Sequence, residues 1–332
     1  MSINFIGNRD VYDYFKNIYQ NNKMGQIYIF DGPEGIGKKY FALLLAKSML
    51  CKNKVFCGCD ECSACRKVNN NIHNDLYVYE PVNLGISIDQ IRMIIQRLKF
   101  KPVESNYSIH IVDAVETMRI EAANAFLKII EEPPEYALII LITTLLDALP
   151  ATVRSRCQLI KFSKISSQEI RDRLISLNVE SNKAYLISLW ANGSLSKALS
   201  IDFENYLDIR NKAVEILKFI VQKGRGKSFP DFLPAGFKRE RDKNEYLREN
   251  MDVLFYFLAD LIREIICIIV KDESSHHPDI EVELRGLCKG IKVDDMFVIL
   301  QRLEKIKWEY RIFHKDYLLL LQKMILMSEI SR

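Results

Sequence analysis

Hydrophobic and polar residues alternate along the first half of the chain in a pattern that predicts strands and helices in turn. Residues 27–31, IYIFD, form a β-branched and aromatic run, and residues 40–50 follow with helical spacing. Two further buried strands are predicted at 109–114 and 138–144, with a helical segment at 120–132 between them. Because these strands are apolar throughout and alternate with helices, they predict a parallel sheet that is covered on both faces.

The pattern becomes helical after a short predicted strand at 158–162. The first helix beyond it is expected to begin with a serine cap. This change predicts an α/β domain at 1–163, a small helical domain at 164–204 and a larger helical domain at 205–332. The long amphipathic segments of the last domain are 213–222, 251–270, 296–310 and 316–327.

Composition and charge describe an ordinary globular protein. Of 332 residues, 48% are apolar and 27% are charged, and the formal net charge is +4. This mild charge permits contact with nucleic acid but does not indicate it. The N-terminal segment MSINFIGNRD lacks the features of a secretory signal, and the longest apolar stretch is interrupted by Asp260, Arg263 and Glu264. A cytoplasmic protein with no membrane segment is therefore expected.

A glycine-rich segment follows the first predicted strand. GPEGIGKKY begins at Gly32 and fits the phosphate-binding pattern G-x-x-x-x-G-K, which ends at Gly37 and Lys38. Backbone N–H groups from Gly35 to Lys38 are expected to face an anion at the start of the next helix, with Lys38 reaching the terminal phosphates. The alternative is a tight turn without a ligand. The strand before the segment and the helix after it favour the nucleotide loop.

Residues that would support hydrolysis are missing from this loop and from the second predicted strand. Lys39 stands where a nucleotide hydrolase has the Ser or Thr hydroxyl that ligates Mg²⁺, and an ammonium there repels the metal. Asp113 is followed by Ala114 instead of a glutamate that would activate water. Glu116 lies two positions too late to replace that glutamate with confidence. The sequence therefore predicts that ATP is bound weakly or not at all and is not hydrolysed.

Five of the eight cysteines lie between Cys51 and Cys65. Cys51, Cys59, Cys62 and Cys65 have the spacing C-x7-C-x2-C-x2-C, which is typical of a structural zinc site with four thiolate ligands. Cys57 is an extra candidate that would replace Cys51. An iron–sulfur cluster and unliganded thiols are the competing hypotheses, although no cysteine follows three residues after Cys65. The other three cysteines, expected in hydrophobic cores, are Cys157, Cys267 and Cys288.

Several segments, taken in order, resemble one family. They are GPEGIGKK, CGCDECSAC, IDQIR, IHIVDA, AANAFLKIIEEPPE and LPATVRSRCQLIKF. Over residues 1–165 the chain resembles the AAA+ subunits of bacterial DNA polymerase III clamp loaders. The resemblance implies an α/β AAA+ nucleotide-binding domain at 1–163, with a P-loop, a parallel sheet and a zinc module at 51–65. It also implies a helical lid at 164–204 and an all-α collar for oligomerisation at 205–332.

Within this family, the tau/gamma type hydrolyses ATP and keeps the Ser or Thr and an Asp-Glu pair, whereas the delta-prime type reads Asp-Ala. Asp113 and Ala114 make this chain resemble the delta-prime type. The resemblance also gives Arg156 the role of an arginine finger, which acts in trans on ATP held by a neighbouring subunit. Thr144 and Lys197 take the places of the two sensor residues, and both are expected to be vestigial here.

The implied partners are the tau/gamma and delta subunits in a hetero-oligomeric ring, the sliding clamp and primed DNA. The chain is then a non-catalytic member of a DNA polymerase holoenzyme complex. Two alternatives remain. One is an ATP-hydrolysing tau/gamma-type subunit with an unusual metal shell. The other is an interaction module in which residues 50–70 bind nucleic acid through the zinc module, although few residues there are basic.

Overall fold

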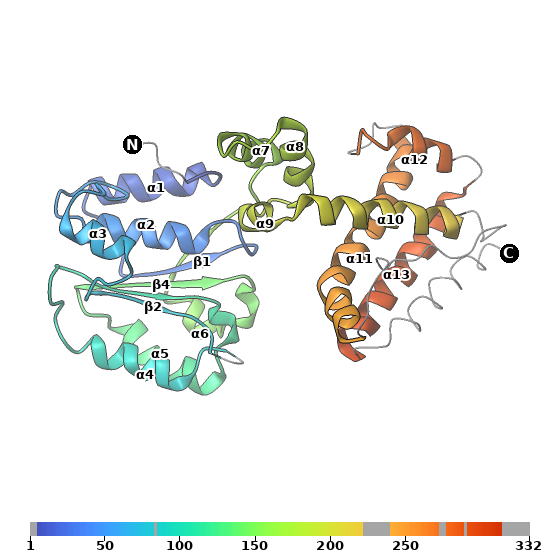
Figure 1. The fold of residues 1–332 in the computed structure, drawn as a ribbon. Coiled ribbons are helices and arrows are strands. Elements are labelled where there is room, and N and C mark those ends of the chain that lie inside the picture. Colours follow the sequence, from blue (N-terminus) through green and yellow to red (C-terminus); the bar gives the residue numbers. More distant parts are fainter. Residues whose placement is uncertain (1–4, 83–84, 222–239, 272–276, 289–290, 314–332) are drawn as a thin grey trace. The chain divides into compact units, whose positions relative to one another are not determined.

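The computed structural model describes residues 5–82, 85–221, 240–271, 277–288 and 291–313. The chain forms two compact units, Met1–Ser200 and Ile201–Arg332 (Figure 1). None of the helices in these described ranges is long and apolar enough to cross a membrane.

The first unit is built on a five-stranded parallel sheet with the strand order β2-β3-β4-β1-β5. The predicted parallel sheet is therefore confirmed. The sequence pattern did not reveal β2, because this edge strand has only four residues and most of them are partly exposed. The strands are β1 (Ile27–Asp31), β2 (Leu76–Tyr79), β3 (Ser108–Val112), β4 (Ala137–Thr143) and β5 (Gln158–Lys161).

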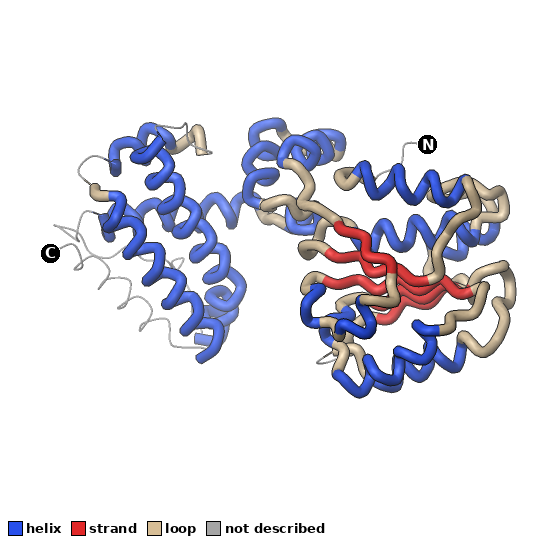
Figure 2. The backbone as a smooth tube through the Cα atoms, turned by 180° about the vertical axis from the view of Figure 1, so that it is seen from behind, coloured by secondary structure: helices blue, strands red, loops and turns tan. Residues whose placement is uncertain are grey.

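Helices cover both faces of this sheet, as Figures 1 and 2 show. Tyr28 and Phe30 of β1 point to one face, where their rings pack with Phe15 and Phe41. The alternating isoleucines of β1 belong to a second apolar cluster on the opposite face. One face carries α1 (Arg9–Gln20), α2 (Lys38–Leu50) and α3 (Ser63–Asn69), and the other carries α4 (Ile88–Arg97), α5 (Ile120–Glu131) and α6 (Ala151–Arg154).

Three short helices complete the first unit. They are α7 (Ser167–Ser176), α8 (Ser181–Trp190) and α9 (Leu195–Ser200). The predicted serine cap is present, because the Ser166 hydroxyl accepts from the Glu169 backbone and the Glu169 carboxylate accepts from the Ser166 backbone. These helices belong to the same compact unit as the sheet, and the division at residues 163 and 164 stays a prediction.

The second unit is helical in the part that the structure describes. Its helices are α10 (Phe203–Val221), α11 (Glu240–Lys271), α12 (Glu281–Cys288) and α13 (Val293–Phe313). The buried guanidinium of Arg210 on α10 donates to both carboxylate oxygens of Asp279, just before α12. This paired charge ties two helices together inside the unit. The helix predicted at 316–327 lies outside the described residues.

A single buried carboxylate fixes the loop that leads into β3. Asp75 is 2% exposed and accepts backbone N–H groups of Val103 at 2.6 Å, Glu104 at 2.8 Å and Ser105 at 2.9 Å. Burial alone raises the pKa of Asp75, but these donors outweigh burial and lower it. The ionised carboxylate therefore satisfies three backbone groups that the fold removes from water.

We expect Asp75→Ala to lower the free energy of unfolding by about 3 kcal/mol, because three N–H donors lose a charged acceptor. Asp75→Asn keeps one acceptor oxygen and should lose less. Since folding lowers the pKa of Asp75, the contribution of the ionised group is complete above the unfolded pKa of about 3.9 and disappears as the pH falls through the folded value. Urea unfolding of both variants at several pH values measures this. A gap between wild type and Asp75→Asn that widens in acid would contradict the assignment.

Candidate nucleotide pocket and zinc site

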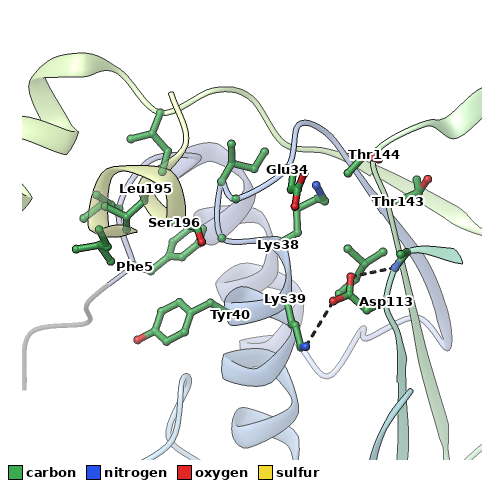
Figure 3. A pocket seen from close by; sticks show the side chains of 18 of the residues that line it. Phe5, Glu34, Lys38, Lys39, Tyr40, Asp113, Thr143, Thr144, Leu195 and Ser196 are labelled. Carbon is green, nitrogen blue, oxygen red and sulfur yellow. Dashed lines mark hydrogen bonds and ion pairs between the residues drawn. The ribbon is translucent and has the colours of Figure 1, made fainter. Parts of the chain in front are cut away.

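The carboxyl ends of the strands border a cavity of about 870 Å³ (Figure 3). Since the strands are parallel, the segments that follow β1, β3 and β4 meet at the same edge of the sheet. The glycine loop connects β1 with α2, which begins at Lys38. The predicted order of strand, glycine loop and helix is therefore present, and the loop forms one wall of the cavity.

The three predicted loop glycines occupy backbone conformations that favour glycine. Gly35 has φ 74° and Gly37 has φ 96° at the N-terminus of α2. Gly32 has φ 152°, and a Cβ atom there would overlap the carbonyl oxygen of Phe162. A side chain at Gly35 would overlap the hydroxyl of Ser194, which precedes α9. The loop can therefore lie against the end of β5 and the residues before α9 only with glycine at these positions.

Lys38 lies at the base of this loop and is buried. Its ammonium donates to the carbonyl oxygen of Gly32 and, at 2.6 Å, to that of Pro33. Burial lowers the pKa of Lys38, while the nearby carboxylates of Glu116 and Asp113 act in the opposite direction. The side chain therefore places a cation against the first residues of the glycine loop, in the wall of the cavity.

Lys39 bridges two carboxylates that come from different strand ends. Its ammonium donates to Glu80, directly after β2, and lies 3.5 Å from Asp113, directly after β3. Figure 3 shows the Lys39 side chain pointing toward Asp113. Burial alone lowers the pKa of Lys39, but the hydrogen bond to Glu80 and the charge of Asp113 outweigh burial and raise it. A charged ammonium thus faces the oxygens that would otherwise be open to a divalent cation.

The predicted second strand ends earlier than the sequence pattern indicated. The predicted range was 109–114, whereas β3 ends at Val112. Ala114 takes φ 50° and ψ 48°, a left-handed conformation that ends the strand. Its N–H donates to the Asp113 carboxylate at 3.0 Å. Asp113 is still joined to the sheet, because its N–H donates to the carbonyl oxygen of Tyr79 at 2.9 Å.

Glu116 enters the cavity, although its sequence position gave it no clear role. Its carboxylate accepts the Thr144 hydroxyl at 2.6 Å and the Thr144 backbone N–H at 3.1 Å. Burial alone raises the pKa of Glu116, but the hydrogen bonds from Thr144 lower it. The predicted sensor position at the end of β4 therefore contacts a carboxylate of the same chain. Only the turn at Ala114 and the short helix η1 (Val115–Thr117) bring these two residues together.

Helices α7 and α9 contribute other residues to the cavity than the sequence predicted. The Ser196 N–H donates to the carbonyl oxygen of Gly35 at 3.0 Å, which joins α9 to the glycine loop. Ser196 and Arg173 of α7 line the cavity, whereas Lys197 is not among the described lining residues. No pattern in the sequence pointed to Arg173, because an arginine on an amphipathic helix ordinarily faces solvent. The sequence analysis also did not identify Glu80, because it directly follows β2, the strand that the pattern did not reveal.

Arg156 lies in the turn between α6 and β5, outside the described lining of its own cavity. One guanidinium nitrogen donates to the carbonyl oxygen of Thr152 at 3.0 Å, and another lies 3.0 Å from a carboxylate oxygen of Glu131. The side chain is 39% exposed. Its position is therefore held by two contacts while part of the guanidinium stays open to solvent.

The structure brings four of the predicted metal ligands together. The Sγ atoms of Cys51, Cys59, Cys62 and Cys65 all lie within 4.8 Å of one another. The Sγ atoms of Cys59 and Cys65 are 3.9 Å apart. Tetrahedral zinc with Zn–S bonds of about 2.3 Å requires sulfur separations of about 3.8 Å. The donor set and its spacing therefore fit a zinc ion.

Helix ends and backbone N–H groups position these cysteines. Cys51 directly follows α2, and Cys62 is the N-cap of α3. The N–H of Cys62 donates to the Cys59 sulfur and the N–H of Cys65 donates to the Cys62 sulfur, each at 3.4 Å. Burial alone raises the pKa of Cys62, but the backbone donors lower it to about 6. The backbone thus stabilises the thiolate form that binds metal.

Cys57 belongs to a different environment. Its N–H donates to the Ser48 hydroxyl at 2.7 Å, and burial raises the pKa of its thiol to about 11. It does not join the four clustered cysteines, so Cys51 is the better candidate for the first ligand.

Outside the cluster, Cys157 and Cys288 are half-buried and Cys267 is exposed. The prediction of a core position is therefore wrong for Cys267, which lies on the solvent side of an amphipathic helix.

We expect the purified protein to contain about one zinc ion per chain, held by the four clustered thiolates. Cys62→Ser should lose most of this zinc and lower the Tm, since the metal links α2 to α3. Cys57→Ser is the matched control and should keep its zinc. Elemental analysis with thermal unfolding measures both effects. A metal-free protein of unchanged stability, or zinc loss in Cys57→Ser alone, would refute this ligand set.

Comparison with known proteins gives matches to a protein family and to curated relatives. Residues 7–166 match the family described as DNA polymerase III, delta subunit. The chain is 34% identical over 203 residues to DNA polymerase III subunit tau of Bacillus subtilis, covering 59% of this chain but only 36% of tau. It is 29% identical over 248 residues to subunit delta' of Bacillus subtilis, covering 74% of each protein.

A solved gamma-subunit-related protein from Thermotoga maritima is 18% identical, with a TM-score of 0.38, over 96% of this chain and 99% of that one. The family match covers the sheet, the glycine loop and the four-cysteine cluster. Residues 7–166 therefore match the DNA polymerase III delta-subunit family, and the chain is similar to the clamp-loader subunits tau and delta'.

Proposed function

We propose that this chain is a non-catalytic, delta-prime-like subunit of the clamp loader, which helps to load the sliding clamp on primed DNA. In this role it donates Arg156 to ATP held by a neighbouring ATPase subunit. The observation that carries the proposal is the Lys39 ammonium, which is bonded to Glu80 and lies 3.5 Å from Asp113. It fills the place that hydrolysis would need for a metal ion.

Hydrolysis of ATP depends on Mg²⁺ to bridge the terminal phosphates and neutralise the charge that develops on them. Magnesium requires oxygen ligands at about 2.1 Å in octahedral geometry. Lys39 offers no oxygen, and its positive charge opposes the dication. Ala114 also has no group that can activate a water molecule. Both features act against the same reaction.

Arg156 supports the second half of the proposal. A guanidinium stays charged and presents its N–H donors in a planar fork, which suits the terminal phosphate of a nucleotide. Arg156 lies away from its own cavity and is partly exposed, with Glu131 and Thr152 holding its side chain. A side chain so placed fits an anion on a different subunit better than one in its own pocket.

The partners follow from the same role. They are tau/gamma and delta subunits in a hetero-oligomeric ring, the sliding clamp, which is reached through that assembly, and primed DNA. The helices of the second unit would supply the collar, and the lid comprises residues 164–204. The four-cysteine cluster would hold zinc as a structural centre. We place this assembly in the cytoplasm.

An ATP-hydrolysing tau/gamma-type subunit is the second candidate, and one observation favours it. Glu116 lines the cavity and keeps a lowered pKa, so a carboxylate is present near the position where a catalytic base is needed. However, its oxygen is bonded to Thr144. Hydrolysis by this route requires Glu116 to leave Thr144 and Lys39 to leave the two carboxylates.

We expect no steady-state ATP hydrolysis by the purified chain with Mg²⁺ and primed DNA present. The cause is the ammonium of Lys39 at the metal position. A coupled phosphate-release assay measures it, with Lys38→Ala as the background control. Turnover that disappears in Lys38→Ala would establish the tau/gamma-type alternative.

In a clamp loader assembled with its ATPase subunits, Arg156→Ala should slow ATP hydrolysis by about tenfold or more, since a finger supplied in trans contributes much of the rate. Arg156→Lys should recover little, because lysine lacks the planar fork. Arg154→Ala is the matched control: Arg154 lies two residues earlier and pairs with Asp147 at 2.8 Å. Equal turnover in wild-type and Arg156→Ala assemblies of the same composition would exclude the finger.

A further inference from the structure

The cavity disfavours a magnesium–nucleotide complex, because the ammonium of Lys39 already lies beside the carboxylates there. The Lys39 ammonium is bonded to Glu80 and lies 3.5 Å from Asp113, so it joins α2 to the ends of β2 and β3. A divalent cation at this place would have to displace the ammonium from both carboxylates. It would also lack the hydroxyl ligand that Lys39 replaces.

The same ammonium remains available to a ligand. A lysine ammonium has three N–H donors, and the described contacts of Lys39 direct two of them to Glu80 and Asp113. The side chain is 36% exposed and lines the cavity. The third N–H of Lys39 can therefore donate to a phosphate oxygen, at the place where a nucleotide hydrolase binds its metal ion.

The rest of the cavity has the parts that a nucleotide requires. The glycine loop and Lys38 offer backbone donors and a second ammonium at the start of α2. Phe5, Tyr40 and Leu195 offer apolar and aromatic surface for a base, and Figure 3 shows them on the opposite side of α2 from Asp113. A volume of about 870 Å³ lies within the range of small-molecule sites.

We propose that this cavity binds a nucleoside di- or triphosphate without magnesium, with Lys39 as the resident counter-ion of the phosphates. This inference takes one point from the proposed function, namely that the site does not hydrolyse its ligand. Magnesium then opposes binding instead of promoting it, because a magnesium–nucleotide complex brings two positive charges toward the ammonium. Binding is modest, since the carboxylates of Asp113 and Glu116 offset part of the positive charge.

The test is calorimetric titration of the zinc-loaded chain with ADP, once in EDTA and once in excess MgCl₂. Both buffers have the same ionic strength, because salt screens these charges. ADP should bind more tightly in EDTA, by a factor on the order of ten. AMP, which lacks the β-phosphate, should bind weakly in both buffers. Lys38→Ala should abolish ADP binding in both.

Two substitutions of Lys39 separate its charge from its bulk. Lys39→Ser removes the ammonium and supplies a hydroxyl ligand, so Mg²⁺ should now strengthen ADP binding and the order of the two affinities should reverse. Lys39→Met removes the charge without a hydroxyl and should bind ADP weakly in both buffers. Retained zinc and an unchanged Tm show that each variant is folded.

Tighter ADP binding by the wild-type chain in MgCl₂, equal affinity in both buffers, or no binding of millimolar ADP in EDTA would each overturn the inference. The wild-type comparison decides this even if a Lys39 variant fails to fold. None of these outcomes affects the role of Arg156, which the assembled complex tests separately. Conversely, ATP turnover by the isolated chain would remove the proposed function, whatever the titration shows.

Discussion

All five strands run parallel, so their carboxyl ends lie at one edge of the sheet, and every proposed role in the pocket depends on that constraint. The pairing of Asp31 with Thr143 of β4 and with Lys161 of β5 places the glycine loop between two strand ends that come much later in the chain. Glu80, Asp113 and Thr144 directly follow β2, β3 and β4 and reach the same edge. The pocket is thus a consequence of the strand order, with its charges supplied by residues just beyond the strands.

Helix α2 connects this pocket with the four-cysteine cluster. It begins at Lys38 and is followed directly by Cys51, about 20 Å away along a thirteen-residue helix. Lys47, in its last turn, also forms an ion pair with Asp60 in the cysteine loop. A zinc ion in the cluster would therefore fix one end of the helix whose other end carries both lysines of the glycine loop. The metal site and the pocket share one rigid element.

The chain places its charged groups in two separate settings. In the pocket, the charged groups of Lys39 and Glu116 each meet residues of the same chain. On the surface, Arg156 keeps part of its guanidinium in solvent while Glu131 holds its orientation. An internally neutralised pocket and an exposed arginine are what a subunit needs if it serves the chemistry of a neighbour and has none of its own. In that proposed role, Lys39 stands in place of a metal-binding hydroxyl, and its ammonium links α2 to the ends of β2 and β3.

The sequence by itself determined the parallel sheet, the glycine loop and the set of clustered cysteines, because each depends on short-range patterns of apolar residues, glycines or thiols. It also indicated that Lys39 and Ala114 do not support hydrolysis. The tertiary structure alone decided that Lys39 meets Glu80, forty-one positions away, and that Glu116 meets Thr144. It also showed that Arg173 lines the cavity, whereas Lys197 is not among the described lining residues. Such partners depend on strand register, on one left-handed residue and on helix rotation, and no local pattern in the sequence encodes these.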